Sequence, residues 1–112
     1  MSTKLKRAVA KGATVLDGNR PGWHRIVKIS ELDMINPEKC VLGQLKGNYW
    51  EGAVLMGIHP REFESHGFVA PLNKEPQESY DAFLKVQQQT WSTLTELWKN
   101  EIRKRRKGKN GC

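Results

Sequence analysis

The residues of this chain that could do chemistry are few, and their spacing matches no common catalytic or metal-binding pattern. His24, Cys40, His59 and His66 come from distant parts of the sequence, without the short ligand pairs that structural zinc sites usually show. A nucleophilic Cys40 would need His24 or His59 as its base. Its apolar neighbours instead predict a buried, inert thiol. Since no phosphate-binding glycine loop is present either, we expect a protein without enzyme activity, metal or cofactor.

The carboxylates give the same indication. The acidic residues that lie close together in the sequence occupy loops or helix starts, where they complement the positive pole of a helix. We interpret them as a solvated acidic edge rather than as a catalytic pair. They are Glu62, Glu64, Glu75, Glu78 and Asp81.

Four tryptophans are the more informative large side chains. Trp91 and Trp98 are seven residues apart, on one face of a predicted helix, and we expect them in the core or at an interface. Trp23 and Trp50 each follow a turn signal and have polar neighbours. Each is therefore either exposed, as an anchor for a protein partner or a stacking platform for a base, or a large residue that closes a small core. On the first interpretation, the predicted partner-binding residues are Arg20, Trp23, His24, Arg25 and Trp50.

The formal net charge of +7 is concentrated at the two ends of the chain. Residues 1–11 hold four basic and no acidic side chains, and residues 99–112 hold seven basic and one acidic. Residues 12–98 hold eight basic and eleven acidic. Basic ends of this kind either contact phosphates or simply aid solubility and complement a helix end. The alternative function is thus nucleic-acid binding, through Lys4, Lys6, Arg7, Arg103, Lys104, Arg105, Arg106 and Lys107.

Length and hydropathy predict one small cytoplasmic domain. A chain of 112 residues can bury a single modest core but not two. No apolar run approaches the roughly 18 residues of a membrane span. Lys11 interrupts the only apolar stretch near the basic start, so the core of a secretion signal is missing.

Helical periodicity dominates the sequence, and glycines and prolines divide it. The stretch after Pro21-Gly22 could be a helical turn or a short strand. Ser30 with Asp33 resembles a capping box, and Asn36-Pro37 is typical of a helix start. The predicted helices cover residues 4–16, 37–46, 48–56, 61–66 and about 80–107, and short strands are candidates at 23–29 and 67–70.

The four glycines of the middle region have two predicted roles. Gly47 and Gly57 should end helices, because a left-handed backbone costs glycine no Cβ clash. Gly43 and Gly52 lie inside helices, which they destabilise by roughly 1 kcal/mol each. We expect both to permit the close approach of another backbone or of an aromatic ring such as Trp91 or Trp23.

The C-terminal helix is the strongest prediction. Large and mostly apolar residues recur there at helical spacing until Ile102, and only basic residues with nothing to bury follow. We expect the last two turns to project from the globule, where a second copy could pair with them. The predicted fold is mainly α: one small domain of short helices packed on this long C-terminal helix. Residues 1–12 form a basic segment with the start of the first helix, residues 13–102 the globular domain, and residues 103–112 a basic tail.

The order of several short motifs carries a resemblance. The motifs are Leu16-Asp17 followed by Pro21-Gly22-Trp23, then Leu32-Asp33-Met34, Cys40-Val41-Leu42-Gly43-Gln44 and His66-Gly67-Phe68. Together with the long helix behind them, they resemble a group of small proteins of actinobacteria and their phages, over roughly residues 13–105. The resemblance implies one compact domain and an accessory role in a phage or bacterium, with a host or phage protein as partner. It implies no catalytic activity.

Overall fold

The fold is mainly α, as the sequence predicts. The computed structural model describes residues 2–71 and 78–110, and no strand occurs among them. The helices are α1 (Ser2–Asn19), α2 (Trp23–Ile26), η1 (Ile29–Glu31), α3 (Val41–Lys46), α4 (Tyr49–Met56), η2 (Pro60–Glu62) and α5 (Tyr80–Asn110), where η marks a 3-10 helix.

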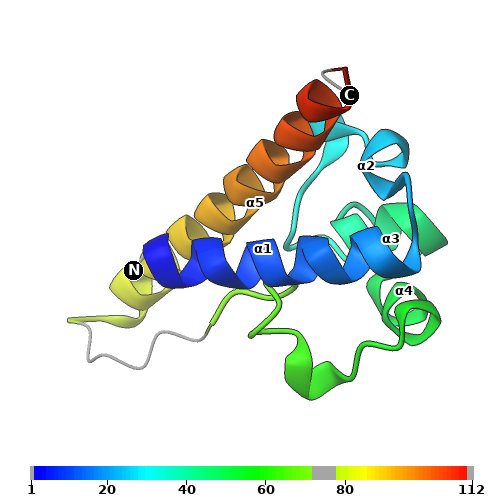
Figure 1. Ribbon diagram of the computed structural model, residues 1–112. Coiled ribbons are helices and arrows are strands. Elements are labelled where there is room, and N and C mark those ends of the chain that lie inside the picture. The colour runs from blue at the N-terminus through cyan, green and yellow to red at the C-terminus, as the bar shows by residue number, and fades with distance from the viewer. Residues whose placement is uncertain (1, 72–77, 111–112) are drawn as a thin grey trace.

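Two long helices form the frame of the molecule. Figure 1 shows α1 crossing α5 at an acute angle, with α2, α3 and α4 grouped beyond the C-terminal half of α1. Short helices therefore pack on a long C-terminal helix, as predicted. The α1 residues at this crossing recur every three or four positions, as do those of α5, which is the spacing of one helix face. They are Val9, Ala13 and Leu16 from α1 with Leu94, Trp98 and Ile102 from α5, and all six are buried.

Trp98 lies at the centre of the core. Its ring is fully buried, packs edge-on against Trp23 with 5.7 Å between centroids, and stacks with Phe68 at 5.3 Å. Its Nε1 donates to the Gly67 carbonyl at 2.6 Å. Three distant segments thus meet on one indole. The segment that begins at Trp23 is a helical turn and not a strand.

The first helix is longer than its sequence pattern predicts. We expected Asp17-Gly18-Asn19 to end it, yet all three residues belong to α1. The Arg20 amide still donates to the Leu16 carbonyl at 2.8 Å. The physical reason is tertiary, because contacts with α2 and α5 hold the Asp17 side chain in the last helical turn.

The predicted start of the third α-helix is wrong by four residues. Asn36 does act as a cap, but its side chain accepts from the Glu38 and Lys39 amides and closes only one turn. α3 begins at Val41, where the Cys40 thiol accepts from the Gly43 amide at 3.3 Å. Sulfur is a weak acceptor, so a cysteine at this position does not usually indicate a helix cap.

Two further local predictions need correction. Ser30 caps nothing: it lies inside η1, whose N-cap is Lys28 without a side-chain hydrogen bond. The helix predicted at 61–66 is a single 3-10 turn, Pro60–Glu62, followed by turns that close at Gly67 with φ 74°. The remaining strand candidate, at 67–70, forms no ladder in the described chain.

The close approaches predicted at two glycines are confirmed. A Cβ on Gly43 would lie 2.3 Å from the Pro37 carbonyl oxygen, and one on Gly52 would lie 2.6 Å from the Leu42 carbonyl oxygen. In both cases the neighbour is backbone and not an aromatic ring. These contacts pack the turn before α3 against α3, and α3 against α4.

Candidate binding surfaces

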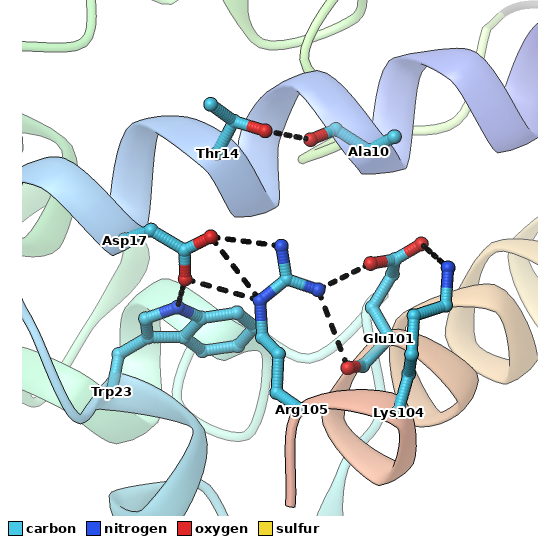
Figure 2. Close-up of polar contacts among 7 residues, drawn as sticks. All are labelled: Ala10, Thr14, Asp17, Trp23, Glu101, Lys104 and Arg105. Atoms are coloured by element: carbon cyan, nitrogen blue, oxygen red, sulfur yellow. Dashed lines mark hydrogen bonds and ion pairs between the residues drawn. The ribbon is translucent and has the colours of Figure 1, made fainter. Parts of the chain in front are cut away.

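Arg105 joins both long helices to α2. Figure 2 shows its guanidinium between two carboxylates, with the Trp23 ring beside it. Nε and Nη2 donate to Asp17 at 3.0 and 2.9 Å, and Nη1 donates to the Glu101 carboxylate. Asp17 Oδ1 also accepts from Trp23 Nε1 at 2.9 Å, and the guanidinium carbon lies 5.7 Å from the Trp23 ring centroid. The arrangement combines a charge-assisted fork with a cation–π contact.

This network explains two pKa shifts. The hydrogen bond from Arg105 holds the pKa of Asp17 below its usual value, although partial burial acts in the opposite direction. In return, the hydrogen bond with Asp17 raises the pKa of Arg105. Both groups are therefore charged at neutral pH. The hydrogen bonds of Arg105 are made within the protein, to Asp17 and Glu101.

Arg106 fastens α5 to α2 on the other side. Its Nε donates to the His24 carbonyl at 2.9 Å and its Nη2 to the Val27 carbonyl at 2.6 Å. These carbonyls belong to the end of α2, where peptide oxygens lack helical partners and the dipole favours a cation. We expected the end of α5 to project from the globule. Instead, it packs against α1 and α2 at least as far as Arg106.

His24 lies within this junction. Both ring nitrogens are shielded from solvent, and neither has a hydrogen-bond partner in the described chain. Burial lowers the pKa of His24, and the nearby guanidinium groups of Arg25, Arg105 and Arg106 add to the effect. The lowered pKa favours the neutral imidazole, and the residue as a whole stays partly exposed.

Of the predicted partner-binding residues, three are exposed and His24 is partly exposed. Arg20 and Arg25 are exposed, and the Trp50 residue is 52% exposed. Trp23 is fully buried, so it cannot be the contact that we expected. Its polar sequence neighbours suggested exposure, but the indole N–H needs no solvent because it donates to Asp17 within the protein.

Two exposed apolar residues that we did not predict as part of the site lie near Trp50. Val54 is 68% exposed and Leu55 is 55% exposed, both on α4 with Trp50. Val54 lies one helical turn after Trp50, so the two side chains share a face. Leu55 lies about 140° from Trp50 around the helix, at the edge of that face. The spacing was visible in the sequence, but a run of apolar residues in a short helix does not show which face is buried. We call Trp50, Val54 and Leu55 the α4 apolar face.

The residues predicted to bind nucleic acid divide into free and engaged ones. Arg105 and Arg106 are engaged in the contacts described above. Lys104 pairs with Glu101 at 3.4 Å, while Arg103 donates only to the Asn100 side chain. The others are exposed and make no ion pair within the described part of the chain; they are Lys4, Lys6, Arg7 and Lys107.

Two grooves border α5. One, of about 260 Å³, lies between α1 and α5 and is lined by Lys6 and Lys104 together with buried Glu101. The other, of about 600 Å³, is shallow and lies between α5 and the Leu32–Ile35 segment, with half-buried Trp91 in its wall. Its lining mixes polar, apolar and oppositely charged side chains, so it favours no one class of ligand.

Cys40, His59 and His66 each take part in local hydrogen bonds. Burial raises the pKa of the Cys40 thiol, which also serves as the cap of α3. His59 Nδ1 accepts from the Arg61 amide, and His66 Nδ1 lies 3.0 Å from the Glu62 carbonyl oxygen. Across residues 2–71 and 78–110, no three His, Cys, Asp or Glu residues lie together as metal ligands would. Glu75, which we placed on the acidic edge, lies outside the described residues.

Comparison with known proteins returns no relative. No protein-family model matches the chain, and no curated protein or solved structure matches it significantly. Among the described helices, none combines the length and apolarity that crossing a membrane requires.

Proposed function

We propose that the protein is a small non-enzymatic module that binds another protein through the α4 apolar face. The observation that carries this proposal is the exposure of Trp50, Val54 and Leu55 on one eight-residue helix. Isolated exposed apolar residues are ordinary, but a tryptophan with apolar neighbours is the usual centre of a protein contact. Trp50 therefore remains part of the proposed binding site, as predicted, whereas Val54 and Leu55 take the place of Trp23.

Charge favours a different protein as the occupant, rather than a second copy. Each copy carries a net charge of +7, so self-association through three side chains would work against repulsion. Residues 29–71, which include α4, hold three basic and six acidic side chains. The surroundings of the face are therefore mildly acidic, and the fitting partner is a neutral or basic protein that offers an apolar pocket for the indole.

The test is affinity capture with a matched pair of variants. Trp50→Ala removes the centre of the face, and Tyr80→Ala removes an aromatic side chain that is 73% exposed at the start of α5. Both side chains are largely solvent-exposed, so we expect both variants to keep the circular dichroism spectrum of the wild type. The wild type and Tyr80→Ala should retain the same purified partner after nuclease treatment and a 1 M NaCl wash. Trp50→Ala should weaken the measured Kd of that partner at least tenfold, which corresponds to about 1.4 kcal/mol.

Two results would overturn the proposal. One is a partner that binds Trp50→Ala as tightly as the wild type. The other is a wild-type chain that forms stable dimers through the α4 apolar face, seen as a mass of two copies by light scattering that Trp50→Ala abolishes.

A further inference from the structure

The structure gathers basic residues from two distant parts of the chain at one end of the molecule. Arg25 follows His24, whose carbonyl accepts from Arg106, so the α2 cation lies beside the last described turns of α5. Arg103, Arg106 and Lys107 fall within a single turn of that helix. All four side chains are exposed. We call Arg25, Arg103, Arg106 and Lys107 the basic end.

The backbone of the basic end is anchored to the rest of the protein, and the charge of its side chains is not compensated by ion pairs in the described chain. Arg106 is fixed to two α2 carbonyls, and Arg105 beside it is fixed to two carboxylates. Within the described residues, none of the four basic-end side chains makes an ion pair. The neighbouring carboxylates, Asp17 and Glu101, are both occupied by Arg105. The helix backbone that carries these cations is therefore anchored, so a bound anion would have to order only their side chains.

The cations cover the solvent side of α5. At about 100° per residue, the side chains of Lys104, Lys107, Arg103 and Arg106 spread over an arc of about 160°. The opposite side carries buried Ile102 and the engaged Arg105. Arg25 extends the arc on the α2 side, and Lys6 extends it on the α1 side, where it lines a groove with Lys104. A curved band of positive charge matches a ligand with several phosphates in a row better than a single anion.

From this arrangement we infer that the basic end binds the phosphate backbone of double-stranded nucleic acid without reading its sequence. Single strands are usually held by exposed aromatic rings on which bases stack. The rings next to the basic end, Trp23 and Trp98, are both fully buried. A membrane surface is less suited, because the large exposed apolar residues of the described chain, other than Ile26 of α2, lie outside α2 and the last turns of α5. They are Ile35, the three residues of the α4 apolar face, and Tyr80 and Leu84 in the first turns of α5. This surface is separate from the α4 apolar face, because Figure 1 shows the helix α4 away from the C-terminal end of α5.

A charge-matched comparison tests the inference. The first variant is Arg25→Gln/Arg103→Gln/Lys107→Gln, which leaves the structural Arg105 and Arg106 intact. The control, Lys39→Gln/Lys46→Gln/Arg61→Gln, removes three exposed cations from the acidic part of the chain. Both lose three positive charges. Deleting the residues after Ile102 is not a clean test, because it would also remove the contacts that hold α5 to α1 and α2.

The assay is fluorescence anisotropy of a labelled 20-base-pair DNA duplex of arbitrary sequence, with full-length protein, between 50 and 300 mM NaCl. We expect the wild type to bind with an affinity that falls steeply with salt. The basic-end variant should bind about tenfold or more weakly at 50 mM NaCl, and the slope of log K against log salt should flatten by about 2 to 3. The control variant should stay within about twofold of the wild type.

Four outcomes would overturn the inference. Equal weakening of both variants would show that only net charge matters, and no binding of the duplex at 50 mM NaCl would leave the surface without this ligand. Tighter binding of a single strand of the same length would exclude the duplex as the preferred ligand. Tighter binding to phosphatidylserine vesicles, lost in the basic-end variant, would assign the surface to a membrane instead.

Discussion

Replacing Arg105 with alanine should destabilise the protein far more than the same change at its neighbour Arg103. The Arg105 side chain is 19% exposed and touches two carboxylates, of which Glu101 is 11% exposed and Asp17 is 45% exposed. Breaking a buried ion pair costs about 3–5 kcal/mol, and an exposed one about 0–1 kcal/mol. Lys104 still compensates Glu101 in part. We therefore expect the free energy of unfolding to fall by about 2–3 kcal/mol, and Tm by about 10 °C.

The assay is urea and thermal unfolding at pH 7, followed by circular dichroism. Arg103→Ala, which removes an exposed side chain two residues earlier, should cost less than about 0.5 kcal/mol. Asp17→Ala should cost about 1–2 kcal/mol, because it leaves the Trp23 N–H without its acceptor. In a double-mutant cycle, Asp17 and Arg105 should then show a coupling energy of about 1 kcal/mol.

The reasoning would be refuted if Arg105→Ala and Arg103→Ala cost the same, or if the coupling energy were below about 0.3 kcal/mol. The pH matters to this design. Because Arg105 lowers the folded-state pKa of Asp17, the stabilisation is complete above the ordinary value of 3.8 and is lost as pH falls through the lowered value. At pH 7 the pair is therefore measured at its full strength.

Two further predictions concern α1 and the α2 junction. Gly12→Ala should destabilise the protein, because its Cβ would lie 2.0 Å from the His66 carbonyl oxygen. Gly18→Ala, in the same helix with nothing within 4 Å, should stabilise it by up to about 1 kcal/mol; equal effects in chemical denaturation would contradict this packing argument. Since the folded-state pKa of His24 is lowered, the unfolded chain binds the proton first, and stability should fall as pH drops below its ordinary value of 6.5. His24→Gln should remove part of that fall in melts from pH 7.5 to 5.0, and an unchanged pH profile would show that His24 does not titrate on unfolding.

The elements that could be predicted from the sequence are those whose cause is local. The face of α5 repeats over many residues, so its buried members, such as Trp98 and Ile102, follow from spacing alone. Gly47 and Gly57 end helices at φ 105° and 70°, because their conformation is a property of one residue. The predicted start of α3 was wrong because two signals compete. The Asn36-Pro37 signal is the stronger one but closes only a turn, and the helix begins after the thiol cap at Cys40.

The candidate surfaces were harder to predict, because exposure is decided by partners far away in the sequence. Trp23 and Trp50 have similar neighbours in the sequence, yet Trp23 is buried. Its contacts come from Asp17, six residues before it, and from the guanidinium of Arg105, 82 residues after it. Trp50 has no such partner among residues 2–71 and 78–110, and it is half exposed. The basic tail presents the same difficulty. Arg105 and Arg103 are two residues apart, and only the tertiary structure distinguishes the internal one from the free one.

The distribution of charge and apolar surface also explains how one small domain could hold two ligands without conflict. The α4 apolar face lies in a part of the chain with an excess of acidic residues, whereas α1, α2 and the end of α5 carry an excess of basic ones. Hydrophobic burial gains little from low salt, whereas phosphate binding is lost as salt rises. We therefore expect a polyanion to avoid the first surface and to be attracted to the second. Because Arg105 and Arg106 hold the second surface in place through internal contacts, neither ligand would need to unfold or displace any part of the core.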